Sequence, residues 1–146
     1  MKTILEKRTA LNASTEFSVR FSEVDSMGIV WHGNYALYFE DAREAFGKKY
    51  HIGYHDILKS GYGAPVVEMQ ISYKRAMPYG TMARAIAFFV NTVAAKVIFE
   101  YEIRSMDDNI LLASGRSVQV FIDDKGQLVL FNPDFYKVWK KKNGIQ

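Results

Sequence analysis

The stretch Phe21-Ser22-Glu23-Val24-Asp25-Ser26-Met27-Gly28-Ile29-Val30-Trp31-His32-Gly33-Asn34-Tyr35 joins an alternating segment to a strongly apolar one. Before it, Glu16 to Ser22 alternates apolar with polar side chains, which predicts a half-buried strand. After it, apolar residues recur at helical spacing from about Asn34 to Tyr50, which predicts a long helix. Asn34 is placed to cap that helix, because its side-chain oxygen can accept a backbone N–H. We therefore expect a polar loop on a rigid base, the usual setting for chemistry.

The expected helix is apolar on more than one side, so it should be covered on more than one side. One apolar face is formed by Tyr35, Tyr38, Phe39, Ala42 and Phe46, and Ala36, Leu37 and Ala45 widen it.

Turn residues divide the rest of the chain into a short helix, four strands and a last helix. The short helix is expected at 54–60 and the strands at 67–74, 83–90, 96–104 and 111–122. Asn132 as cap, Pro133 in the first position and lysines at the far end predict a C-terminal helix with Phe135, Val138 and Trp139 on its apolar face. Residues 1–15 show no period, and we expect them to be partly loose. This order predicts one α+β domain over 1–146: a five-stranded, mostly antiparallel sheet wrapped around a long central helix, plus a C-terminal helix.

Composition excludes several classes of function. The 146 residues contain no cysteine, so disulfides, thiolate chemistry and zinc–thiolate sites are excluded. No apolar run approaches the ~18 residues of a membrane span, and the first ten residues do not resemble a signal peptide, so we expect a cytoplasmic protein. The net charge of +3 comes largely from one short cluster of lysines near the C-terminus, which is too little for a nucleic-acid-binding surface.

The segment from Asp25 to Tyr35 resembles the D-x-x-G-V-V-Y-H-x-N-Y motif of hotdog-fold acyl-CoA thioesterases. The resemblance is to the 4-hydroxybenzoyl-CoA thioesterase type, including relatives associated with the Tol–Pal system, and it extends to about Ile122. It implies a hotdog fold, hydrolysis of acyl-CoA thioesters without a cofactor, and a homo-oligomer, either a dimer or a dimer of dimers. A tetramer is the expectation that we favour. Trp31 stands where tyrosine is common, and Glu23 where many relatives have Asp, which leaves the shape of the pocket open.

The resemblance also assigns roles to residues. Asp25 would be the catalytic nucleophile or general base, and the backbone N–H of His32 would polarise the thioester carbonyl. We expect the substrate to contact Gly28, Val30, Trp31, Gly33, Asn34, Tyr35 and, on a looser match, Lys96.

The chemistry of the loop is consistent with these roles. A thioester needs a positioned nucleophile or base and a place for the developing oxyanion, and a helix N-terminus offers unpaired N–H groups and a partial positive charge. Gly28 and Gly33 allow the backbone to turn and to approach a ligand closely. Asp25 could instead only shape the loop through an Asx turn, and Glu23 could be structural or form a carboxylate pair with it. His51 and His55 are four residues apart, but no third ligand is evident and we expect no metal site.

Three functions remain open from the sequence. The leading hypothesis is an acyl-CoA thioesterase. The alternatives are an acyl-ACP thioesterase and a non-hydrolytic acyl-CoA-binding protein on the same scaffold, since fold does not fix function. In each case we expect a two-fold dimer, because edge strands, the apolar helix surface and the apolar stretch 83–90 should not face water.

Overall fold

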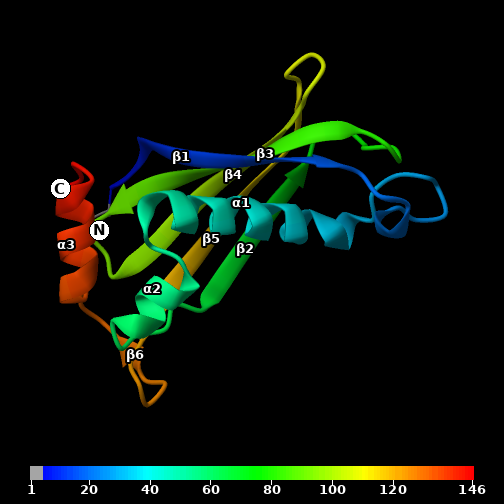
Figure 1. Ribbon diagram of the computed structural model, residues 1–146. Coiled ribbons are helices and arrows are strands. Elements are labelled where there is room, and N and C mark those ends of the chain that lie inside the picture. Colours follow the sequence, from blue (N-terminus) through cyan, green and yellow to red (C-terminus); the bar gives the residue numbers. More distant parts are fainter. Residues whose placement is uncertain (1–4) are drawn as a thin grey trace.

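The structure is a computed structural model that describes residues 5–146. Its strands are β1 (Glu6–Ser18), β2 (Val66–Tyr73), β3 (Met82–Thr92), β4 (Lys96–Ser105), β5 (Leu111–Ile122) and β6 (Leu128–Val129). Its helices are α1 (Tyr35–Tyr50), α2 (Tyr54–Lys59) and α3 (Asp134–Lys142), and the short 3₁₀ turns η1 (Phe21–Glu23) and η2 (His32–Asn34) precede α1 (Figure 1).

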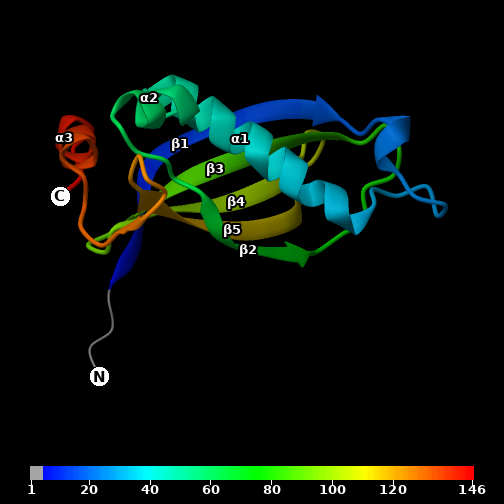
Figure 2. The same cartoon turned by 90° about the horizontal axis from the view of Figure 1, so that it is seen from below.

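The strands form one sheet in the order β1-β3-β4-β5-β2, and every neighbouring pair is antiparallel. The helix α1 crosses one face of this sheet, as the view in Figure 2 shows. The helices α2 and α3 lie near the C-terminal end of α1, and the loop after β1 lies at the opposite end (Figure 1). This arrangement confirms the predicted hotdog fold; it adds the two-residue strand β6, which pairs with β5.

The predicted apolar face of α1 forms the centre of the core. Tyr35, Tyr38, Phe39, Ala42 and Phe46 are each no more than 3% exposed. Phe39 stacks on Tyr101 of β4 with a centroid separation of 4.7 Å. At Gly115 of β5, an added Cβ would lie 2.4 Å from Phe39 Cε2, so this glycine allows the helix to approach the sheet closely.

The apolar side chains of β3 on the outer face of the sheet are covered from within the chain. Ile86 and Val90 of β3 are 9% and 2% exposed. Arg8 of β1 lies 4.0 Å above the Phe88 ring and forms a 2.8 Å salt bridge with Glu100. The apolar stretch of β3 therefore does not by itself require a partner chain, contrary to our expectation.

The strand β1 begins ten residues earlier than the alternation predicts, and it ends at Ser18 instead of Ser22. Two extra residues between Arg8 and Asn12 interrupt the pairing with β3. Thr9 and Thr15 lie at the more buried positions of the strand, so the sequence shows no apolar alternation there. After the strand, Phe21 belongs to η1 and is 77% exposed. Most of the segment expected to be loose is thus strand, and its residues 1–4 lie outside the described part.

The helix α3 also starts differently from the prediction. Asn132 does not cap it; its side-chain amide donates to the Val93 carbonyl at 3.1 Å, and Pro133 immediately precedes the first helical residue. Tyr136 is buried, whereas Val138, expected on the apolar face, is 63% exposed. None of the helices within residues 5–146 combines the length and the apolar character that crossing a membrane requires.

Candidate active site

Asp25 forms the base of a tight turn in the loop between β1 and α1. Its carbonyl accepts the Gly28 N–H at 2.9 Å, and its own N–H donates to the Ile29 carbonyl at 2.9 Å. Gly28 has a φ of 77°, a left-handed conformation that favours glycine. The turn therefore depends on the glycine of the motif.

The Asp25 carboxylate has a structural role in this turn. Its Oδ1 accepts the Met27 N–H at 2.8 Å, which is the Asx turn considered from the sequence. Its Oδ2 accepts no hydrogen bond from any of the residues 5–146, and the side chain is partly exposed. One oxygen thus fixes the turn and the other is available for chemistry.

The start of the long helix presents unpaired donors. The turn η2 runs directly into α1, and the backbone N–H groups of His32 and Gly33 donate to no acceptor within the described chain. Such groups carry the positive end of the helix dipole and favour an anion or a developing negative charge.

The predicted capping role of Asn34 is wrong. Its backbone is helical, with φ −84° and ψ −13°, because the 3₁₀ turn starts the helical segment before it. Its side-chain amide instead donates to the Glu23 carbonyl at 2.9 Å, and that carbonyl also accepts the Trp31 N–H at 3.0 Å. Asn34 therefore attaches the start of α1 to the loop.

Glu23 holds the loop against α1 through its side chain as well. Its Oε1 accepts the Arg20 N–H and the Tyr38 hydroxyl, each at 2.9 Å. Burial raises the pKa of Tyr38 well above its ordinary value, and the bond to Glu23 raises it further. No hydrogen bond joins Glu23 to Asp25, so the structural role is the one observed. The sequence contains a weak signal for this contact: Tyr38 lies one helical turn after Asn34, on the side of α1 that faces the loop.

A hollow of about 260 Å³ adjoins the helix start. Val30, His32 and Tyr35 line it, together with Tyr73, Lys74 and other residues just after β2. Tyr73 donates its hydroxyl to the His32 carbonyl at 2.9 Å, and its ring meets that of Tyr35 edge-on at 4.8 Å. The sequence did not point to Lys74 and Arg75 as neighbours of the loop, since only the sheet topology brings them there.

Trp31 covers Gly33. A Cβ at position 33 would lie 2.3 Å from Cζ3 of the Trp31 indole, so a larger residue would displace the ring. Trp31 is 50% exposed and lies beside His32, with ring centroids 5.1 Å apart. An aromatic surface therefore flanks the two unpaired N–H groups.

Lys96 is not brought to this site within one chain. The pairing of β1 with β3 joins Ser18 to Met82 at the loop end and Glu6 to Thr92 at the other end, beside Lys96. At ~3.3 Å per residue, the ten steps of β3 separate the two ends by roughly 33 Å. Lys96 therefore lies far from the loop of its own subunit, and its predicted contact with CoA stays a prediction for a site shared between subunits.

The two histidines considered as a metal pair do not form a site. His51 ends α1 in a left-handed conformation with φ 59°, and Gly53 separates it from His55 on α2. Within residues 5–146, no group of three potential ligands could hold a metal ion.

Comparisons with known proteins identify the family of this chain. Residues 19–138 match the thioesterase-like superfamily. The protein YneP of Bacillus subtilis, named provisionally as an acyl-CoA thioesterase, is 38% identical over 88 residues, which cover 60% of this chain and 64% of the relative. An acyl-acyl carrier protein thioesterase of Arabidopsis thaliana, ATL3, is 24% identical over 75% of this chain and 58% of its own length. The chain thus spans less than two thirds of each of these curated relatives.

Among solved structures, the DHNA-CoA thioesterase of Staphylococcus aureus superposes with a TM-score of 0.78 and 26% identity, covering 91% of both chains. A 1,4-dihydroxy-2-naphthoyl-CoA thioesterase of Synechocystis superposes with the same TM-score over 92% of this chain at 18% identity, which shows the fold. Each superposition covers most of this chain, so the loop, α1 and the sheet all belong to the shared architecture.

Proposed function

Because the chain belongs to the thioesterase-like superfamily, we propose that it hydrolyses acyl-CoA thioesters to the free acid and CoA. The observation that supports this most directly is that one loop carries both a carboxylate oxygen of Asp25 without a hydrogen-bond donor and the unpaired N–H groups of His32 and Gly33. The names of the relatives support the same class of reaction. The cytoplasmic location expected from the sequence is part of this proposal.

In the proposed reaction, the thioester carbonyl oxygen accepts the His32 N–H at the start of α1, where developing negative charge is stabilised. Asp25 Oδ2 either removes a proton from a water that attacks the carbonyl carbon or attacks that carbon itself. In the first case water supplies the new C–O bond directly; in the second, water cleaves the acyl–Asp25 anhydride afterwards. In both, the C–S bond breaks, the sulfur of CoA leaves with the bonding electrons and takes a proton, and Asp25 ends as a carboxylate.

The proposed site is shared between two subunits. The edge strand β2 exposes Val67 and Tyr73 by 59% and 49%, and Leu37 on α1 is 58% exposed. The other edge strand, β1, carries a bulge and many polar side chains, which oppose edge-to-edge pairing. We therefore propose a two-fold dimer through β2 and α1, with dimers paired into tetramers. Since Lys96 lies at the far end of its own sheet, any contact it makes with CoA would be to a substrate on another subunit's loop.

An acyl carrier protein ester is the second candidate substrate, and the Arabidopsis relative named for that activity supports it. Rates of thiol release from matched CoA and carrier-protein esters separate the two candidates. A protein that binds acyl-CoA tightly but releases no thiol with any acyl chain would be the non-hydrolytic alternative, and that result would contradict the proposed reaction.

The test of the reaction is Asp25→Asn, because asparagine keeps an acceptor for the Met27 N–H and removes the carboxylate. We expect kcat for thiol release to fall by about 10²–10⁴-fold, the usual contribution of a catalytic base. Asp123→Asn is a matched control, since Asp123 accepts the Lys125 and Gln127 N–H groups in a turn remote from the site. Turnover by the Asp25 variant close to that of the control would refute the assignment.

A further inference from the structure

A second hollow, larger than the one at the helix start, lies away from the loop, between the C-terminal end of α1, α2 and α3. Its volume is about 410 Å³, within the range of small-molecule sites. α1 has 16 residues, so at ~1.5 Å per residue its two ends are roughly 24 Å apart. The hollow, which we call the helix-end groove, is therefore separate from the site of Asp25 in the same chain.

The floor of the helix-end groove is apolar. Ile52 and Trp139 are 8% and 6% exposed and line it, together with Phe135 of α3. The Trp139 indole N–H donates to the Tyr50 carbonyl at 2.8 Å, which fixes α3 against the end of α1. The floor is thus a rigid aromatic surface that can hold an apolar body.

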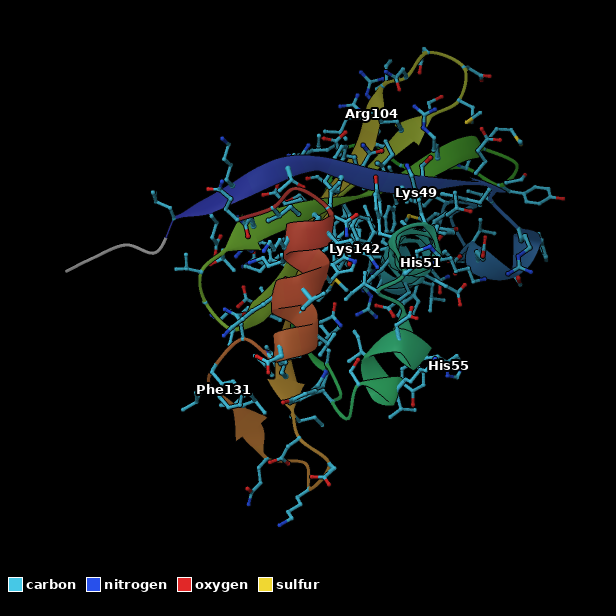
Figure 3. All side chains as sticks on the ribbon, turned by 60° about the vertical axis from the view of Figure 1, so that its left-hand side comes forward. Lys49, His51, His55, Arg104, Phe131 and Lys142 are labelled. Carbon is cyan, nitrogen blue, oxygen red and sulfur yellow. The ribbon has the colours of Figure 1, made fainter. Side chains whose placement is uncertain are left out.

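The rim of the groove is cationic, with one lysine from each of the three helices. Lys49, Lys59 and Lys142 all line it. Figure 3 shows Lys142 on the side of α3 toward the end of α1 that carries Lys49 and His51. Lys59 and Lys142 form no salt bridge or hydrogen bond with other residues of the described chain, whereas Lys49 donates to the Asn12 carbonyl at 2.8 Å.

Negative charge in the groove is small. Asp56 is the single carboxylate among the lining residues, and its Oδ2 accepts the Gly53 N–H at 2.8 Å at the start of α2. Lysines near the last turns of α1 and α3 also stabilise the negative ends of those helices. This helix-dipole effect explains why the lysines lie near the ends of their helices. It does not explain why lysines from three different helices surround one aromatic floor.

We propose that the helix-end groove binds a small organic anion, whose carboxylate or phosphate group lies between the lysines and whose apolar body rests on Trp139 and Phe135. This proposal does not depend on the proposed reaction, since the groove is at the opposite end of α1. Lysine ammonium groups act as point charges and accept either kind of anion, so the shared chemistry is an anionic head joined to an apolar or aromatic body.

The test uses the fluorescence of Trp139 in the full chain. Trp31 and Trp139 are the two tryptophans, so Trp31→Phe leaves a single fluorophore, in the floor of the groove. The probes are decanoate, adenosine 3′,5′-bisphosphate and inorganic phosphate. In this background, Lys59→Gln with Lys142→Gln removes the two unpaired groove lysines, and Lys48→Gln with Lys141→Gln is the matched control outside the groove.

We expect at least one organic probe to change the Trp139 emission with saturation, and its Kd to rise about tenfold or more in the groove variant. The control variant should change Kd by less than about twofold. Binding of decanoate alone identifies a carboxylate ligand, and binding of the bisphosphate alone identifies a phosphate ligand. The proposal is overturned if no organic probe gives a saturable change, if both variants weaken binding equally, or if inorganic phosphate binds as tightly as the organic probes.

Discussion

Replacing Tyr38 by phenylalanine would remove one hydroxyl group from the contact that holds the candidate loop against α1. The ring would keep its stack on Phe17, whose centroid lies 4.0 Å away, so the change isolates the hydrogen bond to Glu23. The Glu23 side chain is 15% exposed and would keep the Arg20 N–H as a donor. A hydrogen bond to a charged group of this kind contributes about 1.5–3 kcal/mol, and we expect Tyr38→Phe to lower the free energy of unfolding by that amount.

A double-mutant cycle separates this bond from other effects of the substitution. Glu23→Gln keeps a neutral acceptor, so removing the Tyr38 hydroxyl in that background should cost only about 0.5–1.5 kcal/mol. The coupling free energy measured by urea unfolding is therefore expected to be about 1 kcal/mol. Tyr50→Phe on the same helix is the control, because its hydroxyl bonds only the neutral backbone of Asn12. A coupling energy below about 0.3 kcal/mol would show that the charge of Glu23 does not strengthen the bond. A cost of Tyr38→Phe below about 0.5 kcal/mol in the wild-type background would show that the bond does not hold the loop.

Three further predictions concern the sheet and the assembly. Burial alone would raise the pKa of Glu102, but hydrogen bonds from Arg104 and Arg8 hold it below its ordinary value of 4.5. The ionised Glu102 therefore stabilises the fold fully above about pH 4.5, and this stabilisation is lost as the pH falls through its lowered pKa. Glu102→Gln should make the free energy of unfolding, measured by urea titration at a series of acid pH values, depend less steeply on pH. The same pH dependence in the variant and the wild type would contradict this prediction. Gly115→Ala should lower the free energy of unfolding by about 1–3 kcal/mol, because the added methyl would overlap an aromatic ring of α1; wild-type stability would refute this packing. Wild-type protein should sediment at no less than twice 16.7 kDa and Leu37→Asp closer to 16.7 kDa, whereas a folded, active wild-type monomer would refute the shared site.

The sequence predicted the parts of the fold that follow a regular period. The apolar face of α1 and the strands β3, β4 and β5 agree with their patterns within one or two residues. The start of β1 was missed because Thr9 and Thr15 lie at its more buried positions, so apolar and polar residues do not alternate along it. β2 pairs with β5 and not with β3, its neighbour along the chain. Periodicity could not predict this, because it shows which side chains of a strand face the core but not which strand lies beside it.

The site was predictable as a location and less so as a set of contacts. The motif predicted that Asp25 and the start of α1 belong to one loop, and both lie in the segment between β1 and α1. The role of Asn34 was predicted wrongly because the residue type alone does not distinguish a capping position from a position inside a 3₁₀ turn. The contact predicted for Lys96 remains a prediction, since a loose match along the sequence contains no information about which subunit's loop lies beside it.

The division of labour between Glu23 and Asp25 has a physical basis in their neighbours. Both are carboxylates two residues apart, and the backbone carbonyls of both accept hydrogen bonds. The carboxylate groups differ: that of Glu23 accepts two hydrogen bonds, one of them from the buried Tyr38 hydroxyl, whereas that of Asp25 accepts only the Met27 N–H. A carboxylate that is largely buried and bonded to a buried hydroxyl contributes rigidity, because losing that partner leaves its charge less compensated. A carboxylate held by one oxygen is positioned but still has a free lone pair toward solvent and substrate. The departure from the family pattern at Glu23 therefore affects how firmly the loop is held, and the residue proposed to carry out the chemistry remains Asp25.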